Sequence, residues 1–218
     1  MFRVASRRAS YRDEASEDRL LVLPLSGGTV VLAVADGVGG QPGGGLAAQF
    51  ALDTIRELAP TLLYRRSQTW QRLLRAIDNG LVQDPEAGLT TLVVICLSRK
   101  KLMGASVGDS EAWWVTKEGH FDLTEAQNRK PYLGSGRAAP VPFELKLPSD
   151  GTLVMATDGL FKYADPLAVT DTVRIGLEEA PEALQTLVEG PGGRLYDDLA
   201  IVVAQADKIP LWTRFLSR

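Results

Sequence analysis

Hydrophobic residues along the chain form short continuous runs at first and then recur with a helical period. Two apolar runs, 20–25 and 30–35, are joined by Ser-Gly-Gly at 26–28, which predicts a hairpin of two buried strands. Between 46 and 81, apolar residues recur at every third or fourth position. This spacing predicts two amphipathic helices, separated near Pro60 and Ser67.

The rest of the chain contains strand-like segments separated by turns. Segments rich in β-branched and aromatic residues, typical of strands, lie at 91–97, 102–107, 111–116, 143–147, 152–157 and 199–204. A helix is predicted over 181–188, whereas 119–142 is rich in turn residues. Strands and helices occur in blocks and do not alternate one by one, so the pattern favours an α+β fold with largely antiparallel sheets.

Domain organisation and charge exclude several classes of protein. No repeat or low-complexity linker divides the 218 residues, so we expect a single domain over 1–206 and a short amphipathic tail at 207–218, packed on the core or acting as a docking peptide. Lys and Arg number 24 against 27 Asp and Glu, a net charge of −3, with no concentrated basic run. This balance argues against a nucleic-acid or membrane-surface partner. No signal-peptide-like or membrane-spanning run is found, and we expect a cytoplasmic protein.

The chain has one cysteine and one histidine, which limits its chemistry. A lone Cys96 excludes an internal disulfide and a multi-cysteine zinc site, and its apolar surroundings predict a small buried side chain. A lone His120 excludes multi-histidine metal sites. Because it follows Lys-Glu-Gly at 117–119, we expect His120 to be a solvated residue of a hairpin turn.

Acidic residues recur where the predicted strands begin or end. For any single aspartate, a turn or capping role is the simpler interpretation. Here the pattern occurs at five places, and at 36–37, 108–109 and 158–159 a glycine lies beside the acid. Two carboxylates ~4 Å apart repel by about 4 kcal/mol at an effective dielectric of 20, so a convergent cluster needs cations. All-oxygen ligands select Mg²⁺ or Mn²⁺, and two such ions can activate a shared water for attack on a phosphoryl group.

These acids lie in segments that resemble the motifs of a known family. Six segments resemble, in the same order, the motifs of the type 2C metal-dependent protein phosphatases (PPM family) in their short bacterial form: Ser16 to Asp18, Val34 to Gly40, Thr90 and Thr91, Val107 to Ser110, Ala156 to Leu160, and Asp197 to Val202. The resemblance spans about residues 3–206. It implies a four-layer α-β-β-α fold, in which pairs of antiparallel helices flank a sandwich of two antiparallel sheets.

The resemblance also implies a role for each acid. Asp36 would bridge two metal ions, Asp158 and Asp197 would complete one site, and Glu17 with the carbonyl of Gly37 would serve the other. Asp36, Asp158 and Asp197 are thereby the candidate catalytic residues. Asp109, together with Asp158, would hold a third and weaker ion. Asp18 is expected to support the ligands without touching the metal.

The activity implied is Mn²⁺- or Mg²⁺-dependent hydrolysis of phosphoserine and phosphothreonine monoesters on proteins, by a hydroxide that bridges two divalent ions. The expected partner is a phosphorylated protein substrate whose kinase this enzyme opposes in signalling, and a monomer is the default state. The turn-rich region 119–142 resembles the family's flap, where substrate choice is expected to reside.

Some positions depart from the family pattern. The phosphate-binding Arg usually lies four residues before the residue matched by Glu17, where this chain has Asp13. Arg12 is the nearest candidate for that role, with Arg129, Lys130 and Lys162 as alternatives. Further departures are Ser16 and Asp198 in place of Asn, and Val38 where some relatives have His.

Two other functions compete with this hypothesis. A catalytically weak or inactive phosphatase-like domain, acting as a regulatory module that binds a phosphoprotein or partner, would explain the displaced Arg. Retention of all five acids favours the enzyme. The glycines at 43–45 formally fit a dinucleotide-binding fingerprint, but they lie several residues beyond the preceding strand and lack the acidic residue that this fold requires.

Overall fold

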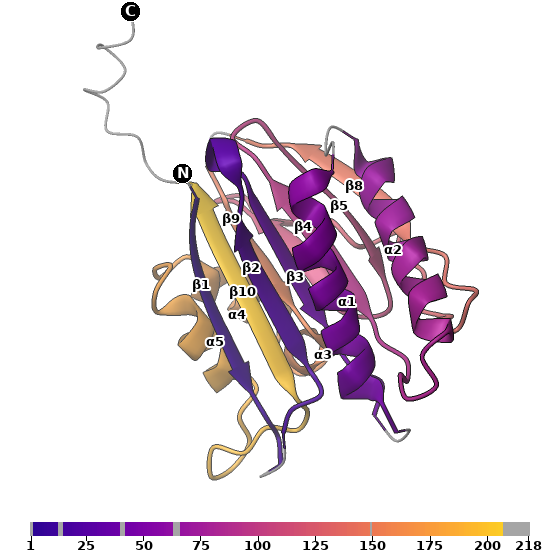
Figure 1. Cartoon of the computed structure of the whole chain (residues 1–218). Coiled ribbons are helices and arrows are strands. Elements are labelled where there is room, and N and C mark those ends of the chain that lie inside the picture. Colours follow the sequence, from indigo (N-terminus) through magenta and orange to yellow (C-terminus); the bar gives the residue numbers. More distant parts are fainter. Residues whose placement is uncertain (1, 13–14, 40–41, 63–65, 149, 207–218) are drawn as a thin grey trace, which may run out of the picture.

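In the computed structural model, two five-stranded antiparallel sheets face each other, and helices cover their outer sides (Figure 1). The structure describes residues 2–12, 15–39, 42–62, 66–148 and 150–206, and the tail expected at 207–218 therefore lies outside the described residues. Within the described part of the chain, no helix is long and apolar enough to cross a membrane.

One sheet has the order β1-β10-β9-β6-β7 and the other β2-β3-β4-β5-β8. The strands of the first sheet are β1 (Phe2–Ala9), β10 (Leu199–Ala206), β9 (Thr152–Ala156), β6 (Glu111–Val115) and β7 (His120–Asp122). The strands of the second are β2 (Arg19–Pro24), β3 (Val30–Ala35), β4 (Leu92–Leu97), β5 (Lys101–Val107) and β8 (Val141–Lys146). The helices are α1 (Gly44–Leu58), α2 (Ser67–Val82), α3 (Asp158–Phe161), α4 (Pro166–Val173) and α5 (Ala180–Leu187).

The two sheets bury a shared core between them. Leu32 of β3, Trp114 of β6, Leu153 of β9 and Val202 of β10 belong to one cluster of buried residues in this layer. Strand β3 is buried at every position because the sheets cover one of its faces and helices cover the other. Burial on both faces explains why this strand is a continuous apolar run rather than an alternating one.

Helices form the two outer layers. On one side α1 and α2 pack against the β2–β8 sheet through buried residues such as Ile55 and Trp70 (Figure 1). On the other side α4 and α5 pack against the first sheet through Val169, Val173 and Leu184. The α+β class, the antiparallel sandwich and the helix pairs expected from the sequence are confirmed.

Four elements were absent from the sequence expectations, namely strands β1 and β7 and helices α3 and α4. Strand β1 pairs with β10 along its whole length, from Phe2 opposite Ala206 to Ala9 opposite Leu199. It is an edge strand whose charged residues alternate with less exposed ones, so it carries no apolar run. Helices α3 and α4 are only four and eight residues long, too short to show a clear helical period.

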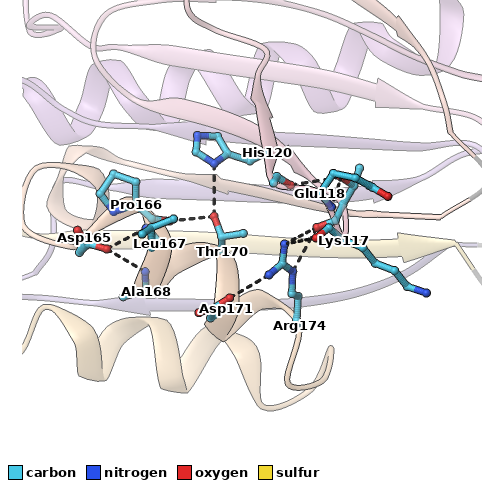
Figure 2. Close-up of polar contacts among 12 residues, drawn as sticks. Lys117, Glu118, His120, Asp165, Pro166, Leu167, Ala168, Thr170, Asp171 and Arg174 are labelled. Atoms are coloured by element: carbon cyan, nitrogen blue, oxygen red, sulfur yellow. Dashed lines mark hydrogen bonds and ion pairs between the residues drawn. The ribbon is translucent and has the colours of Figure 1, made fainter.

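The expectation that His120 is a solvated turn residue is wrong. His120 begins β7, its ring stacks on Trp113 with centroids 4.0 Å apart, and its Nδ1 lies 3.3 Å from the Thr170 hydroxyl on α4 (Figure 2). The guanidinium of Arg174 donates to the carbonyl of Thr116, which joins the end of α4 to the turn after β6. This polar network fastens α4 to the β6–β7 hairpin.

The expectation for Cys96 is confirmed. The side chain is fully buried in β4, and burial raises the pKa of its thiol to about 12. A thiol with this pKa stays protonated at neutral pH and is a poor nucleophile.

The layered core makes a testable prediction about stability. Leu32→Ala should lower the free energy of unfolding by about 2–5 kcal/mol, because it leaves a cavity between the two sheets. Leu167→Ala is the matched control, since Leu167 is 74% exposed and its truncation should change stability by no more than about 0.5 kcal/mol. Urea denaturation measures both values, and equal losses would contradict this packing.

Candidate functional site

The acids expected to form the site lie where strands of both sheets begin or end. Asp36 follows β3, Asp109 follows β5, and Asp158 follows β9. Glu17 and Asp18 precede β2, while Asp197 and Asp198 precede β10. The antiparallel register places Arg19 opposite Ala35 and Ile201 opposite Ala156. In each sheet, the strand ends that carry these acids therefore lie side by side.

Asp36 is the centre of this cluster. Burial raises the pKa of its carboxyl to about 10, with further contributions from the negative charges of Asp18, Asp158, Asp109 and Asp197, in that order. Burial also raises the pKa of Asp18 to about 7, and that of Asp158 rises for the same reason. Asp36 and Asp158 are thus each subject to the negative charge of neighbouring aspartates. The aspartates are therefore close enough to repel one another at this end of the sandwich.

The Thr90-Thr91 motif holds the backbone of Asp36. The Asp36 amide donates to the Thr91 hydroxyl at 3.0 Å, and its carbonyl accepts from the Thr90 hydroxyl at 2.8 Å and from the Thr91 amide at 2.9 Å. The Thr91 hydroxyl also lies 2.7 Å from that of Ser110. These bonds connect the ends of β3 and β5, which carry Asp36 and Asp109.

Glycines beside the acids allow close backbone approach. A Cβ on Gly37 would lie 2.3 Å from the carbonyl carbon of Gly44 at the start of α1. A Cβ on Gly159 would lie 2.1 Å from the carbonyl oxygen of Asp198. Gly108, in contrast, has a φ of +110°, which turns the chain sharply before Asp109. Each glycine lets an acid-bearing turn pack against a neighbouring segment.

Asp18 is buried and hydrogen-bonded directly before β2. Its side chain is 1% exposed, and its Oδ2 accepts from the Thr157 hydroxyl at 2.6 Å. The same hydroxyl accepts from the amide of Ala200 at 2.9 Å. Thr157 immediately precedes Asp158, so these bonds join the ends of β2, β9 and β10.

Asp198 has a role that sequence reasoning missed. It accepts from the Ser10 hydroxyl and the Tyr11 amide at 3.1 Å and from the Glu17 amide at 2.7 Å. These contacts hold both ends of the connection between β1 and β2 against the start of β10. The only sequence signal was a second acid after Asp197, which was noted as a departure from the family pattern.

Glu17 and Arg12 lie on the same β1–β2 connection. A Cβ on Gly39 would lie 3.6 Å from Glu17 Oε2, so the Glu17 carboxylate faces the loop that begins at Gly37. The Arg12 guanidinium carbon lies 4.6 Å from the centroid of the Tyr11 ring, and among the described residues no acid of the cluster contacts it. Asp13, at the usual position of the phosphate-binding Arg, lies outside the described residues.

Lys162 forms ion pairs with two acids of the cluster. Its Nζ lies 3.7 Å from Asp158 Oδ2 and 3.5 Å from Asp197 Oδ2. Lys162 lies one helical turn after Asp158, at the C-cap position that follows α3. The Lys162 ammonium therefore partly balances the charge of these two carboxylates.

The donor set fits hard divalent ions. Among the described residues, no three His, Cys, Asp or Glu side chains are already close enough together to hold a metal ion. Even so, the cluster offers only oxygen donors, and the raised pKa of Asp36 reflects acids that an external cation would neutralise. Mg²⁺ and Mn²⁺ match this chemistry, and thiol or imidazole donors are absent from the cluster as described.

The chain matches proteins of known class. Residues 26–207 match the family model described as Stage II sporulation protein E (SpoIIE). A serine/threonine phosphatase, Stp, of Listeria innocua serovar 6a is 27% identical over 106 residues, which cover 44% of this chain and 42% of that protein. The chain thus aligns with less than half the length of this curated relative.

Solved structures show the same fold. The Staphylococcus aureus serine/threonine phosphatase Stp1 has a TM-score of 0.81 at 18% identity and covers 95% of this chain and 96% of its own. The catalytic domain of the phosphatase PstP, solved with two manganese ions, has a TM-score of 0.78 at 20% identity and covers 94% and 97%. These structures show that the chain has the fold of the type 2C phosphatases, and the family match shows that it belongs to the SpoIIE family.

Proposed function

We propose that this protein hydrolyses phosphoserine and phosphothreonine monoesters on proteins with the help of two divalent ions, Mn²⁺ or Mg²⁺. The observation that carries the proposal is the acid cluster, in which burial and the negative charges of four other aspartates raise the pKa of Asp36. A solved relative of this fold that holds two manganese ions supports the choice of cofactor.

Each acid has a role in the proposal. Asp36 would contact both ions, Asp158 and Asp197 would complete one site, and Glu17 with the Gly37 carbonyl would form the other. Asp109 with Asp158 would hold a third ion. When bound, the ions would neutralise the cluster, activate water and polarise the phosphoryl group. Asp18 and Thr157 would hold the ligands in position.

An enzyme explains the cluster better than a binding module does. Gathering carboxyl groups that repel one another lowers the stability of the fold. A module that only binds a partner does not require such a cluster, whereas a metal-dependent enzyme does. The second candidate, a weak or inactive phosphatase-like regulatory module, is supported by the contact of Arg12 with Tyr11 instead of the acids. The proposal also includes a phosphoprotein substrate, an opposing Ser/Thr kinase, a monomer and a cytoplasmic location.

Metal-dependent turnover tests the proposed activity. The protein should hydrolyse p-nitrophenyl phosphate and a phosphothreonine peptide with Mn²⁺ present and not in chelator. Asp36→Asn and Asp158→Asn should each lower turnover at least ~100-fold, since even residues that only support metal ligands commonly contribute 10–100-fold. Asp109→Asn should mainly change the occupancy of the third ion.

Asp171→Asn is the matched control for these substitutions, because Asp171 is exposed on α4 and pairs with Arg174. It should keep full turnover. A folded wild-type protein without metal-dependent turnover would favour the regulatory module.

Thermal melting tests metal binding without any substrate. Mn²⁺ at about 100 times its Kd should stabilise the fold by ~2.7 kcal/mol, which raises Tm by roughly 5–10 °C in a chain of this size. In metal-free protein, the raised pKa values of Asp18 and Asp36 mean that the folded state keeps protons that the unfolded state loses above about pH 4. The contribution of Asp18 to stability therefore falls as pH rises from about 4 to 7, and that of Asp36 falls from about 4 to 10.

Because protons compete with Mn²⁺ for these carboxyls, the metal-induced rise in Tm should be larger at pH 8 than at pH 5. Asp36→Asn should lose most of this rise. An equal rise in wild type and Asp36→Asn would exclude Asp36 as a ligand.

The grip on the substrate phosphate can be assigned by comparing two cations. If Arg12 holds the phosphate, Arg12→Gln should raise KM about tenfold with little change in kcat. This change corresponds to a loss of ~1.4 kcal/mol of binding free energy. An unchanged KM for Arg12→Gln together with a raised KM for Lys162→Gln would assign the grip to Lys162, whose Nζ already lies beside Asp158 and Asp197.

A further inference from the structure

A cavity of about 650 Å³ lies beside the acid cluster and has no part in the roles assigned so far. Val38 and Leu89 line one side, and Lys130, Tyr132 and Arg137 of the flap line the other. Within the first side, the Val38 amide donates to the Leu89 carbonyl at 2.9 Å. The cavity therefore combines apolar walls with two cationic side chains.

The cavity adjoins the cluster at two points. Val38 is only two residues beyond Asp36 along the chain. Tyr132 lines the cavity, while its hydroxyl lies 3.5 Å from Asp109 Oδ2. One aromatic side chain thus separates the two sites. About two residues of extended peptide, at ~3.3 Å each, would connect a phosphate at the cluster with a side chain in the cavity.

The flap wall of the cavity is held in place by Asp78 of α2. Its side chain is 3% exposed. Its Oδ1 accepts from the amides of Gly134 and Gly136 at 2.8 and 3.0 Å, and its Oδ2 accepts from the amide of Ala138 at 3.0 Å. Leu133 also exchanges two backbone hydrogen bonds of 3.1 Å with Thr90, whose hydroxyl donates to the Asp36 carbonyl. The wall is therefore preformed, which lowers the entropic cost of binding.

The charge of the cavity is opposite to that of the cluster. Lys130 and Arg137 are exposed, and among the described residues neither is paired with an acid. The Lys130 Nζ lies 5.6 Å from the centroid of the Tyr132 ring, which keeps it at the cavity. A carboxylate in a substrate would be repelled by the aspartates and attracted here.

We propose that this cavity binds an acidic side chain of the substrate, about two residues from the phosphorylated Ser or Thr, so that the protein prefers phosphopeptides with a neighbouring Glu. The inference rests on the proposed function, because it places the phosphate at the acid cluster. The methylenes of Glu would contact Val38 and Leu89, and its carboxylate would pair with Lys130 and Arg137.

Two phosphothreonine peptides test the proposal. They are identical except for Glu or Gln at both positions two residues from the phosphothreonine, and kcat/KM is measured in Mn²⁺ buffer. We expect the Glu peptide to be preferred about fivefold, in line with the modest energy of exposed ion pairs. Lys130→Gln combined with Arg137→Gln should reduce this ratio of kcat/KM values between the two peptides below about twofold.

The matched control is Arg99→Gln combined with Lys100→Gln. These residues lie in the turn between β4 and β5, at the end of β5 that is remote from Asp109. The two substitutions remove as much positive charge as the Lys130 and Arg137 substitutions do. This variant should keep the preference. A preference that is absent in wild type, or that the two variants lose equally, would overturn the proposal.

The two proposals fail in different ways. Turnover of both peptides at the same rate would leave the phosphatase function intact and exclude the acidic subsite. If neither peptide is hydrolysed, the proposed function fails, and the Kd values of the two labelled peptides by fluorescence anisotropy decide the subsite alone. A Kd ratio near one would then exclude the subsite too.

Discussion

The structure depends on holding several buried carboxyl groups together against their mutual repulsion. Burial of Asp36 among four other aspartates is unfavourable unless protons or cations neutralise the group. Hydrogen bonds from backbone amides and threonine hydroxyls fix the turns that carry the acids, so the turns cannot separate to relieve the repulsion. The sandwich supplies this rigidity because each turn ends a strand that is paired along its length.

Much of the fold and of the site was predictable from local patterns. The apolar runs of β3 and β4 predicted buried strands, because burial on both faces removes any polar alternation. The acids stood out because each follows or precedes such a run, and the glycines beside them indicated tight turns. The hydrogen bond between Asp18 and Thr157, in contrast, joins two segments far apart in the chain and could not be predicted from local patterns.

The features that were missed depend on tertiary contacts. Asp198 and Asp78 each hold a distant loop through several backbone amides, and a carboxylate that accepts amide bonds has no sequence signature. Strand β1 has charged residues on its exposed positions and is recognisable only by its pairing with β10. The stacking of His120 on Trp113 likewise requires two strands to be in register.

The pairing of β1 with β10 also determines where the described chain enters and leaves the fold. Phe2 lies opposite Ala206, whereas Ala9 and Leu199 lie at the other end of the same pair, close to Asp197 and Asp198 (Figure 1). Phe2 and Ala206 therefore both lie at the end of this strand pair that is remote from the acids. An affinity tag or fluorescent reporter attached at Phe2 would thus leave the acid cluster accessible to bulky protein substrates.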